Sequence, residues 1–211
     1  MATLKVGSLF AGYGGLSLAV EHVFGAELAW YSEFDDAPSK VMAHHWPGVP
    51  NLGDITKIDW ATVPPVDIID GGSPCQDLSA AGRRAGMTEG TRSNLWVNMR
   101  EAIAILKPQY VVWENVRGAL SAPAVSEEDE HARNREMEFG TGLLGDERSR
   151  PTLRAAGRVL GDLASLGYDA EQHSLPASEI GAPHGRFRVF VLATRREDPA
   201  NTGSATIGQY A

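Results

Sequence analysis

A cysteine and a glutamate occupy matching places after two apolar segments of this 211-residue sequence. Cys75, the only cysteine, follows the apolar run 66–70, and Glu114 follows the apolar run 110–113. Such runs, bounded by turn-forming residues, predict buried strands. Because the carboxyl ends of parallel strands meet at one edge of a sheet, one site could hold both side chains. A thiol there could act as a nucleophile if its surroundings lowered its pKa from roughly 8.5.

Apolar and amphipathic segments alternate along the chain and place these residues in an α/β domain. Helices are predicted at 15–24, 37–46, 95–106 and 153–166, and strands at 4–10, 28–31, 51–55, 66–70, 110–113, 170–175 and 188–194. This alternation predicts one doubly wound, mostly parallel sheet. For Cys75 or Glu114 alone, an inert buried thiol or a capping carboxylate is the simpler interpretation, but their matched positions favour a site.

The composition predicts one globular domain in a reducing compartment. The chain is 43% hydrophobic and 22% charged, and no apolar run approaches the ~18 residues of a membrane span. A single cysteine forms no internal disulfide, and the first residues do not resemble a signal peptide, so we expect a cytoplasmic protein with no membrane partner. The histidines lack the usual spacing of metal ligands, and we therefore expect no metal site.

The net charge of −8 argues against an extensive nucleic-acid footprint, since phosphate binding draws on Lys and Arg. Part of this acidity is local, because acidic residues outnumber arginines within residues 127–150. We predict a domain over residues 1–196 with a charged insertion at 121–150, followed by a flexible tail at 197–211.

A glycine-rich turn and two acids indicate where a nucleotide ligand would bind. Residues 10–15, Phe-Ala-Gly-Tyr-Gly-Gly, join the first predicted strand to the first helix, where glycines let the backbone approach a ligand. Glu33 ends the second strand, where such sheets place an acid against ribose hydroxyls, and Asp54 could accept from an adenine amino group. A structural turn and helix caps are the simpler interpretations. Together these groups favour an adenosine ligand.

These segments, taken in order, resemble the DNA (cytosine-5) methyltransferases. The matching stretches extend over nearly the whole chain and are Phe10-Ala11-Gly12-Tyr13-Gly14-Gly15, Ser32-Glu33-Phe34-Asp35, Gly53-Asp54-Ile55, Gly71-Gly72-Ser73-Pro74-Cys75-Gln76, Glu114-Asn115-Val116 and Gly185-Arg186-Phe187-Arg188-Val189-Phe190. The resemblance implies a Rossmann-like fold of the S-adenosylmethionine-dependent methyltransferase type. It also implies S-adenosyl-L-methionine as methyl donor and a cytosine flipped out of double-stranded DNA as acceptor.

The resemblance implies a role for each matching residue. Cys75 would add to carbon 6 of cytosine, and Glu114 would stabilise the ring at nitrogen 3 and the exocyclic amine. Arg186 and Arg188 would contact the base and hold Cys75 and Glu114 in position. The cofactor pocket would comprise Phe10, Gly12, Gly14, Glu33, Phe34, Asp54, Ile55 and Pro74. Residues 76–93 match a mobile loop that closes over the base, with phosphate contacts from Arg83, Arg84 and Arg92.

Two parts of the family pattern have no counterpart after residue 194: a variable target-recognition region and a closing Gly-Asn-x-Val-Pro segment. Three interpretations follow. The chain is a catalytic half that acts with a second polypeptide carrying the recognition region, a truncated or vestigial methyltransferase that binds the donor or a partner without efficient turnover, or a non-enzymatic nucleotide-binding module. The presence of Cys75, Glu114, Arg186 and Arg188 together argues against the third.

Overall fold

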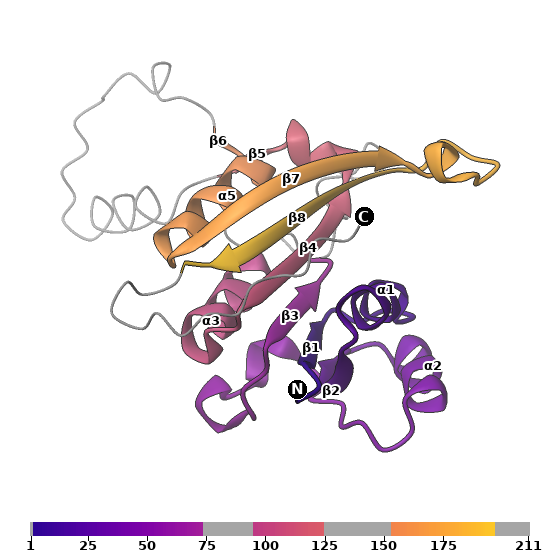
Figure 1. Cartoon of the computed structure of the whole chain (residues 1–211), viewed down its shortest axis with the longest axis vertical. Coiled ribbons are helices and arrows are strands. Elements are labelled where there is room, and N and C mark those ends of the chain that lie inside the picture. The colour runs from indigo at the N-terminus through magenta and orange to yellow at the C-terminus, as the bar shows by residue number, and fades with distance from the viewer. Residues whose placement is uncertain (1, 74–94, 125–152, 197–211) are drawn as a thin grey trace, which may run out of the picture.

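The structure is a computed structural model, which describes residues 2–73, 95–124 and 153–196 (Figure 1). Its main sheet has six strands in the order β2-β1-β3-β4-β8-β7. The first four strands in this order are parallel, and β8 runs antiparallel to both β4 and β7. Their bounds are β1 Lys5–Leu9, β2 Glu27–Ser32, β3 Ile68–Gly71, β4 Tyr110–Val116, β7 Tyr168–Pro176 and β8 Phe187–Arg195.

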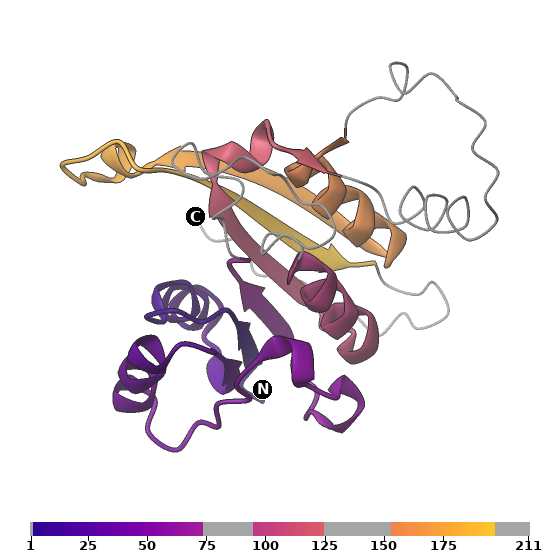
Figure 2. The ribbon, with the colours of Figure 1, turned by 180° about the vertical axis from the view of Figure 1, so that it is seen from behind.

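Helices lie on both faces of this sheet, as the views from either side show (Figures 1 and 2). On one face α1 (Gly15–Phe24) and α2 (Asp36–His45) lie beside the amino-terminal strands. On the other face α3 (Trp96–Leu106) and α5 (Ala155–Ser165) cover β4, β8 and β7. The predicted doubly wound, mostly parallel sheet is therefore confirmed. The short elements are η1 Ile55–Lys57, η2 Trp60–Thr62, η4 Arg117–Leu120, β5 Pro123–Ala124, β6 Leu153–Arg154 and η6 Ala177–Ile180.

Alternating side chains of the parallel strands separate two hydrophobic cores. Ile68 is buried with Val20 of α1 and Met42 of α2, whereas its neighbour Ile69 is buried with Met99 of α3 and Leu163 of α5. Consecutive residues of a strand point to opposite faces, so a continuous apolar run such as that in β3 is what a sheet covered on both sides requires. These buried strands fix the positions of the polar residues at their carboxyl ends.

The predicted strand at residues 51–55 is wrong. Asn51 forms only an isolated parallel bridge with Tyr31, and the chain then turns into η1. Gly53 has a φ of 75°, in the left-handed region that ends extended structure. Asp54 then caps η1 by accepting a hydrogen bond from the Thr56 amide at 3.1 Å. The segment nevertheless lies beside β2, since the Leu52 amide donates to the Tyr31 carbonyl at 2.7 Å.

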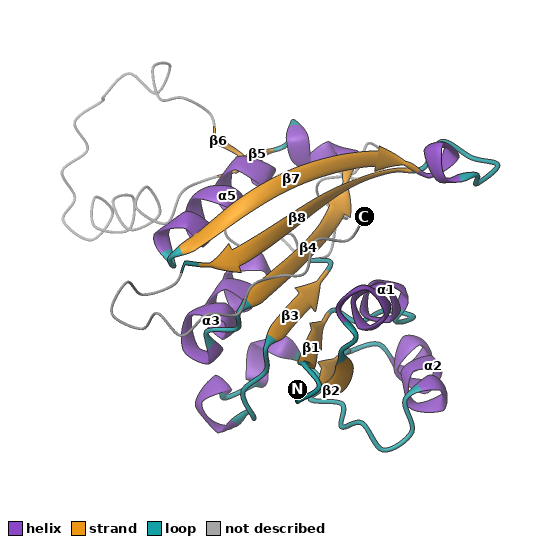
Figure 3. Cartoon of the chain, viewed as in Figure 1, coloured by secondary structure: helices purple, strands orange, loops and turns teal. Residues whose placement is uncertain are grey.

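One face of β7 and β8 carries no helix among the described residues (Figure 3). Leu192 of β8 and Leu175 of β7 are 38% and 43% exposed there. The hairpin of these two strands also extends beyond the rest of the sheet and ends in η6 (Figure 1). Within the described ranges, the structure has no helix of the length and apolar character needed to cross a membrane.

Candidate active site

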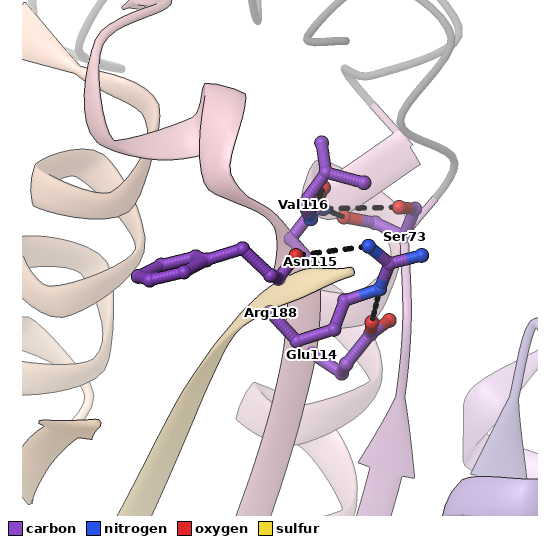
Figure 4. Close-up of polar contacts among 6 residues, drawn as sticks. Ser73, Glu114, Asn115, Val116 and Arg188 are labelled. Atoms are coloured by element: carbon purple, nitrogen blue, oxygen red, sulfur yellow. Dashed lines mark hydrogen bonds and ion pairs between the residues drawn. The ribbon is translucent and has the colours of Figure 1, made fainter. Parts of the chain in front are cut away.

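Glu114 and Arg188 form an ion pair at the carboxyl end of β4 (Figure 4). In the antiparallel register, Val116 lies opposite Arg188 and Glu114 lies opposite Phe190. Side chains two residues apart on one strand share a face, so Glu114 and Arg188 are diagonal neighbours on the same side of the sheet. The Arg188 Nε atom lies 2.5 Å from the Glu114 Oε1 atom.

This ion pair is largely withdrawn from water. The side chains of Arg188 and Glu114 are 21% and 27% exposed. Burial raises the pKa of the Glu114 carboxyl, and the positive charges of Arg188 and Arg186 oppose this rise without cancelling it. Glu114 therefore keeps a proton to higher pH than an ordinary glutamate, which suits a group that donates a proton to a weakly basic ring nitrogen.

Gly72 leaves room for the Glu114 carboxylate. It follows directly after β3, and a β-carbon added to it would lie 2.9 Å from the Glu114 Oε2 atom. That separation is below van der Waals contact, so any larger residue would displace the carboxylate or the backbone. The glycine thus allows the segment leaving β3 to pass directly against the ion pair.

Ser73 is fixed by two buried residues of β4, a feature that the sequence analysis missed. The Ser73 hydroxyl accepts hydrogen bonds from Trp113 Nε1 at 3.1 Å and from Asn115 Nδ2 at 3.2 Å. Asn115 Nδ2 also donates to the Ser73 carbonyl at 3.1 Å. The only sequence signal was the alternation in β4, which turns Trp113 and Asn115 to the face opposite Glu114. Pro74 and Cys75 follow Ser73 and lie outside the described residues, as do the predicted loop 76–93 and its arginines.

Arg186 lies at the same end of the sheet, just before β8. Its side chain is exposed, and its carbonyl accepts a hydrogen bond from the Ala177 amide at 2.8 Å. Its charge acts on Glu114 through space. The structure thus brings Glu114, Arg186 and Arg188 to one edge. Of the predicted charged insertion at 121–150, only residues 121–124 are described, and the predicted tail at 197–211 is outside the described residues.

The glycine-rich turn between β1 and α1 has an unusual backbone. Phe10, Gly12 and Gly14 have φ values of 54°, 55° and 79°, and such a value is uncommon for a bulky residue such as phenylalanine. Gly14 caps α1, and a β-carbon there would lie 2.5 Å from the ring of Trp46, which follows α2. Trp46, which the sequence analysis did not single out, therefore packs directly on the turn.

Glu33 ties the end of β2 to this turn. Its two carboxylate oxygens accept hydrogen bonds from the Gly12 amide at 2.7 Å and from the Asp35 amide at 2.8 Å. Phe34 beside it is 74% exposed. An ionisable acid next to an exposed aromatic ring and a glycine turn fits the ribose and adenine of a nucleoside ligand.

The third predicted ligand segment is held mainly by its own contacts. Hydrogen bonds from Thr56 lower the pKa of Asp54, and Lys57 Nζ lies 3.2 Å from Asp54 Oδ2. The Ile55 side chain is 6% exposed and belongs to the core. Among the described residues, no three or more metal-ligating side chains gather in one place.

Comparison with known proteins identifies the family. A family model for C-5 cytosine-specific DNA methylases matches residues 4–134. The chain belongs to this family. The predicted resemblance to the DNA (cytosine-5) methyltransferases is thereby confirmed.

Individual relatives show how much of such proteins the chain represents. A DNA N-6-adenine-methyltransferase of Escherichia phage P1 is 38% identical over 94% of this chain and 29% of its own length. The Type II methyltransferase M.NgoBV of Neisseria gonorrhoeae is 29% identical over 94% of this chain and 43% of its own length. The chain therefore spans less than half of either relative.

A solved structure shares the fold. The S. pombe Dnmt2 methyltransferase superposes with a TM-score of 0.57 at 16% identity, over 92% of this chain and 50% of that protein. The Rossmann-like sheet of the chain is therefore a fold found in methyltransferases of known structure.

Proposed function

We propose that this C-5 DNA methylase chain transfers a methyl group from S-adenosyl-L-methionine to carbon 5 of a cytosine flipped out of double-stranded DNA, through a covalent adduct with Cys75. The main support is the half-buried pair of Glu114 and Arg188, which lies against Gly72 just before Cys75 in the sequence. A thiol next to a carboxyl of raised pKa is the combination that the chemistry of a cytosine ring requires.

The first step makes carbon 5 nucleophilic. The Cys75 thiolate forms a bond to carbon 6, and the electron pair of the ring shifts toward nitrogen 3, which takes a proton from Glu114. Arg188 stabilises the glutamate that loses this proton, because its guanidinium is already in contact with the carboxylate. The resulting enamine reacts at carbon 5.

The remaining steps restore the ring. Carbon 5 would form a bond to the methyl group that S-adenosyl-L-methionine supplies when bound, while the bond between this methyl group and the positively charged sulfur would break and leave S-adenosylhomocysteine. A base removes the proton from carbon 5, the bond between carbon 6 and sulfur breaks, and Cys75 leaves as the thiolate. Glu114 recovers the proton from nitrogen 3 and is ready for another cycle.

The donor would lie on the glycine-turn side of the sheet edge. Glu33 would accept from the ribose hydroxyls and Phe34 would contact the adenine ring. A carboxylate has about four lone-pair positions, so Glu33 can accept these bonds and keep those from the Gly12 and Asp35 amides. Phe10, Gly12 and Gly14 would shape the turn beneath the donor, and Asp54, Ile55 and Pro74 would border its adenine.

The name of the phage P1 relative raises adenine as an alternative acceptor. Methylation of an exocyclic amine needs no thiol adduct, so Cys75 and the Glu114–Arg188 pair favour cytosine. A second polypeptide that carries DNA recognition also belongs to the proposal. It is supported by the net charge of −8, which leaves little positive charge for binding DNA phosphates. The single cysteine suits the reducing cytoplasm, where we place the activity.

Duplex DNA containing 5-fluorocytosine tests the proposed nucleophile, because fluorine cannot leave carbon 5 as a proton does. A covalent adduct should form in the presence of the donor, and Cys75→Ser should abolish it. An adduct of undiminished yield in Cys75→Ser would contradict the assignment.

Tritiated donor and mixed duplex DNA test the acceptor and the need for a partner. The labelled nucleoside should be 5-methylcytosine rather than N6-methyladenine, and the chain alone should incorporate little label. Strong site-specific incorporation by the chain alone would show that no second polypeptide is needed. Failure of the folded chain to bind S-adenosylhomocysteine in calorimetry would remove the donor site.

A further inference from the structure

Asp70, in β3, is a buried carboxyl whose neighbours are two serines. Its Oδ1 atom accepts a hydrogen bond from Ser8 Oγ at 2.6 Å and lies 3.4 Å from Ser17 Oγ. Ser17 Oγ also donates to Ser8 Oγ at 2.8 Å. Asp70 is 1% exposed, and its buried Oδ2 atom has no hydrogen-bond partner among the described residues. Carboxylates buried this deeply are ordinarily paired with a cation.

The Asp70 carboxyl changes between its neutral and its ionised form near neutral pH. Burial raises the pKa of Asp70 to about 7, against the lowering effect of the hydrogen bonds from Ser8 and Ser17. Glu21, on the next turn of α1, raises it further and is the charged group that faces Asp70 among the described residues. Glu21 itself accepts hydrogen bonds from the Leu28 amide at 2.8 Å and Trp46 Nε1 at 2.9 Å. The elements around Asp70 therefore contribute negative charge and hydroxyl groups.

The cluster of Ser8, Ser17 and Asp70 lies between the two halves of the proposed site. Ser8 precedes the glycine turn, and Ser17 belongs to the first turn of α1. Asp70 pairs in register with Ser8, and Gly71 after it leads into the segment that passes Glu114. Under the proposed function, the donor's nucleoside lies on the glycine turn while its methyl group reaches a cytosine held at Glu114, so its sulfur would come to the part of the sheet edge between them.

Donor and product differ in charge at that sulfur. S-adenosylmethionine carries a positive sulfonium, whereas S-adenosylhomocysteine is an uncharged thioether that is otherwise the same molecule. The following inference rests on the proposed function. We propose that Asp70 makes the site discriminate between donor and product, because its ionised form favours the cationic donor over the neutral product. The carboxyl thereby acts on the donor from beneath the glycine turn, without touching it.

The size of the effect follows from Coulomb's law. Two unit charges about 10 Å apart, at an effective dielectric constant of about 20, change an equilibrium constant on the order of tenfold. The preference is present when Asp70 is ionised and is lost as the pH falls and the carboxyl takes up its proton. Binding of the donor should in turn favour ionisation of Asp70, because linkage is reciprocal.

Calorimetry of both compounds across about pH 6 to 8.5 tests the proposal. The ratio of the two dissociation constants removes what the two molecules share, and the same measurement on Asp70→Asn removes the effect of the sulfonium on the ligands' own amino groups. In the wild type the preference for the donor should rise on the order of tenfold across this range. In Asp70→Asn this rise should be absent, and only the pH dependence of the ligands' own amino groups should remain. Asp67→Asn is a matched control, since Asp67 precedes β3 at its other end and accepts from the Lys5 amide at 2.8 Å.

Ser8→Ala supplies a second variant, in case Asp70→Asn does not fold. It removes a hydrogen bond that stabilises the ionised carboxyl, so the rise in donor preference should move to higher pH. A ratio that is independent of pH in the wild type, or an unchanged pH dependence in Asp70→Asn, would overturn the inference alone. If the folded wild-type chain bound neither compound, the proposed donor site would fall, and the inference with it.

Discussion

The proposed donor side, which contains Glu33 and Asp54, and the proposed catalytic edge, which contains Glu114 and Arg188, hold their acidic residues in different ways. Both Glu33 and Asp54 accept hydrogen bonds from backbone amides: Glu33 from Gly12 of the glycine-rich turn at 2.7 Å, and Asp54 from Thr56 of its own turn at 3.1 Å. Glu114 instead lies against a guanidinium, and burial raises its pKa. Donor-side acids therefore organise the backbone that a ligand would meet. The carboxyl of the proposed catalytic edge has a raised pKa, which suits proton exchange, so the two regions should respond differently to substitution.

Glu114→Gln should have the largest effect. The amide cannot transfer a proton to nitrogen 3, so adduct formation with 5-fluorocytosine DNA should slow by about 10²–10⁴-fold. Affinity for S-adenosylhomocysteine should stay within about twofold, since Glu114 is not on the donor side. Glu101→Gln, an exposed glutamate of α3, is the control. Adduct formation at the wild-type rate in Glu114→Gln would remove Glu114 from the mechanism.

Gly72→Ala should have the next largest effect on adduct formation. The new methyl group would lie 2.9 Å from Glu114 Oε2 and would push the carboxylate out of place. Adduct formation should fall by about tenfold, because small misplacements of catalytic groups are costly. Gly161→Ala in α5 is the matched control, since a β-carbon there meets nothing within 4 Å. Equal rates for both variants would show that the space beside Glu114 is unimportant.

Glu33→Gln should change binding and stability together. One carboxylate oxygen becomes an amino group, which cannot accept from the Gly12 or Asp35 amide. Donor affinity should fall roughly tenfold, and the free energy of unfolding should fall by about 1 kcal/mol. Calorimetry measures the donor affinity, and denaturant titration measures the free energy of unfolding. Lost stability with unchanged affinity would make Glu33 a purely structural cap.

Asp54→Asn should have the smallest effect. Asparagine keeps the oxygen that caps η1 and loses only the charge facing Lys57, so donor affinity should fall no more than about threefold. Asp59→Asn is the matched control, because Asp59 caps η2 in the same way through the Ala61 amide. Equal donor affinities in the two variants would place Asp54 outside the donor site.

Local sequence patterns predicted most of the fold, because buried strands and amphipathic helices are encoded by neighbouring residues. The segment 51–55 failed because its apolar residues were outweighed by the turn-forming Gly53 and the capping Asp54. Strand order and the antiparallel β8 depend on contacts between distant segments. Patterns alone could not supply them.

Residues of the candidate site could be predicted where they belong to a sequence motif. They could not be predicted where their place in the site depends on contacts between segments distant in sequence. Glu114, Arg186 and Arg188 were named from their motifs, and the structure brings them to one edge, while their catalytic roles stay predictions. Ser73 and Trp46 gain their roles only from what packs against them. Asp70 was concealed within an apolar run, where nothing in the sequence indicates that no described residue would form a hydrogen bond with its Oδ2 atom.

The place of β8 in the sheet has a consequence for how the protein matures. β8 is the last described strand along the chain, yet it inserts between β4 and β7. Contacts between segments distant in sequence form late, because the intervening chain must first be closed into a loop. A nascent or partly folded chain therefore has Glu114 without Arg188. The ion pair of the proposed site forms only when the sheet is complete, so we expect any catalytic activity to be confined to the native state.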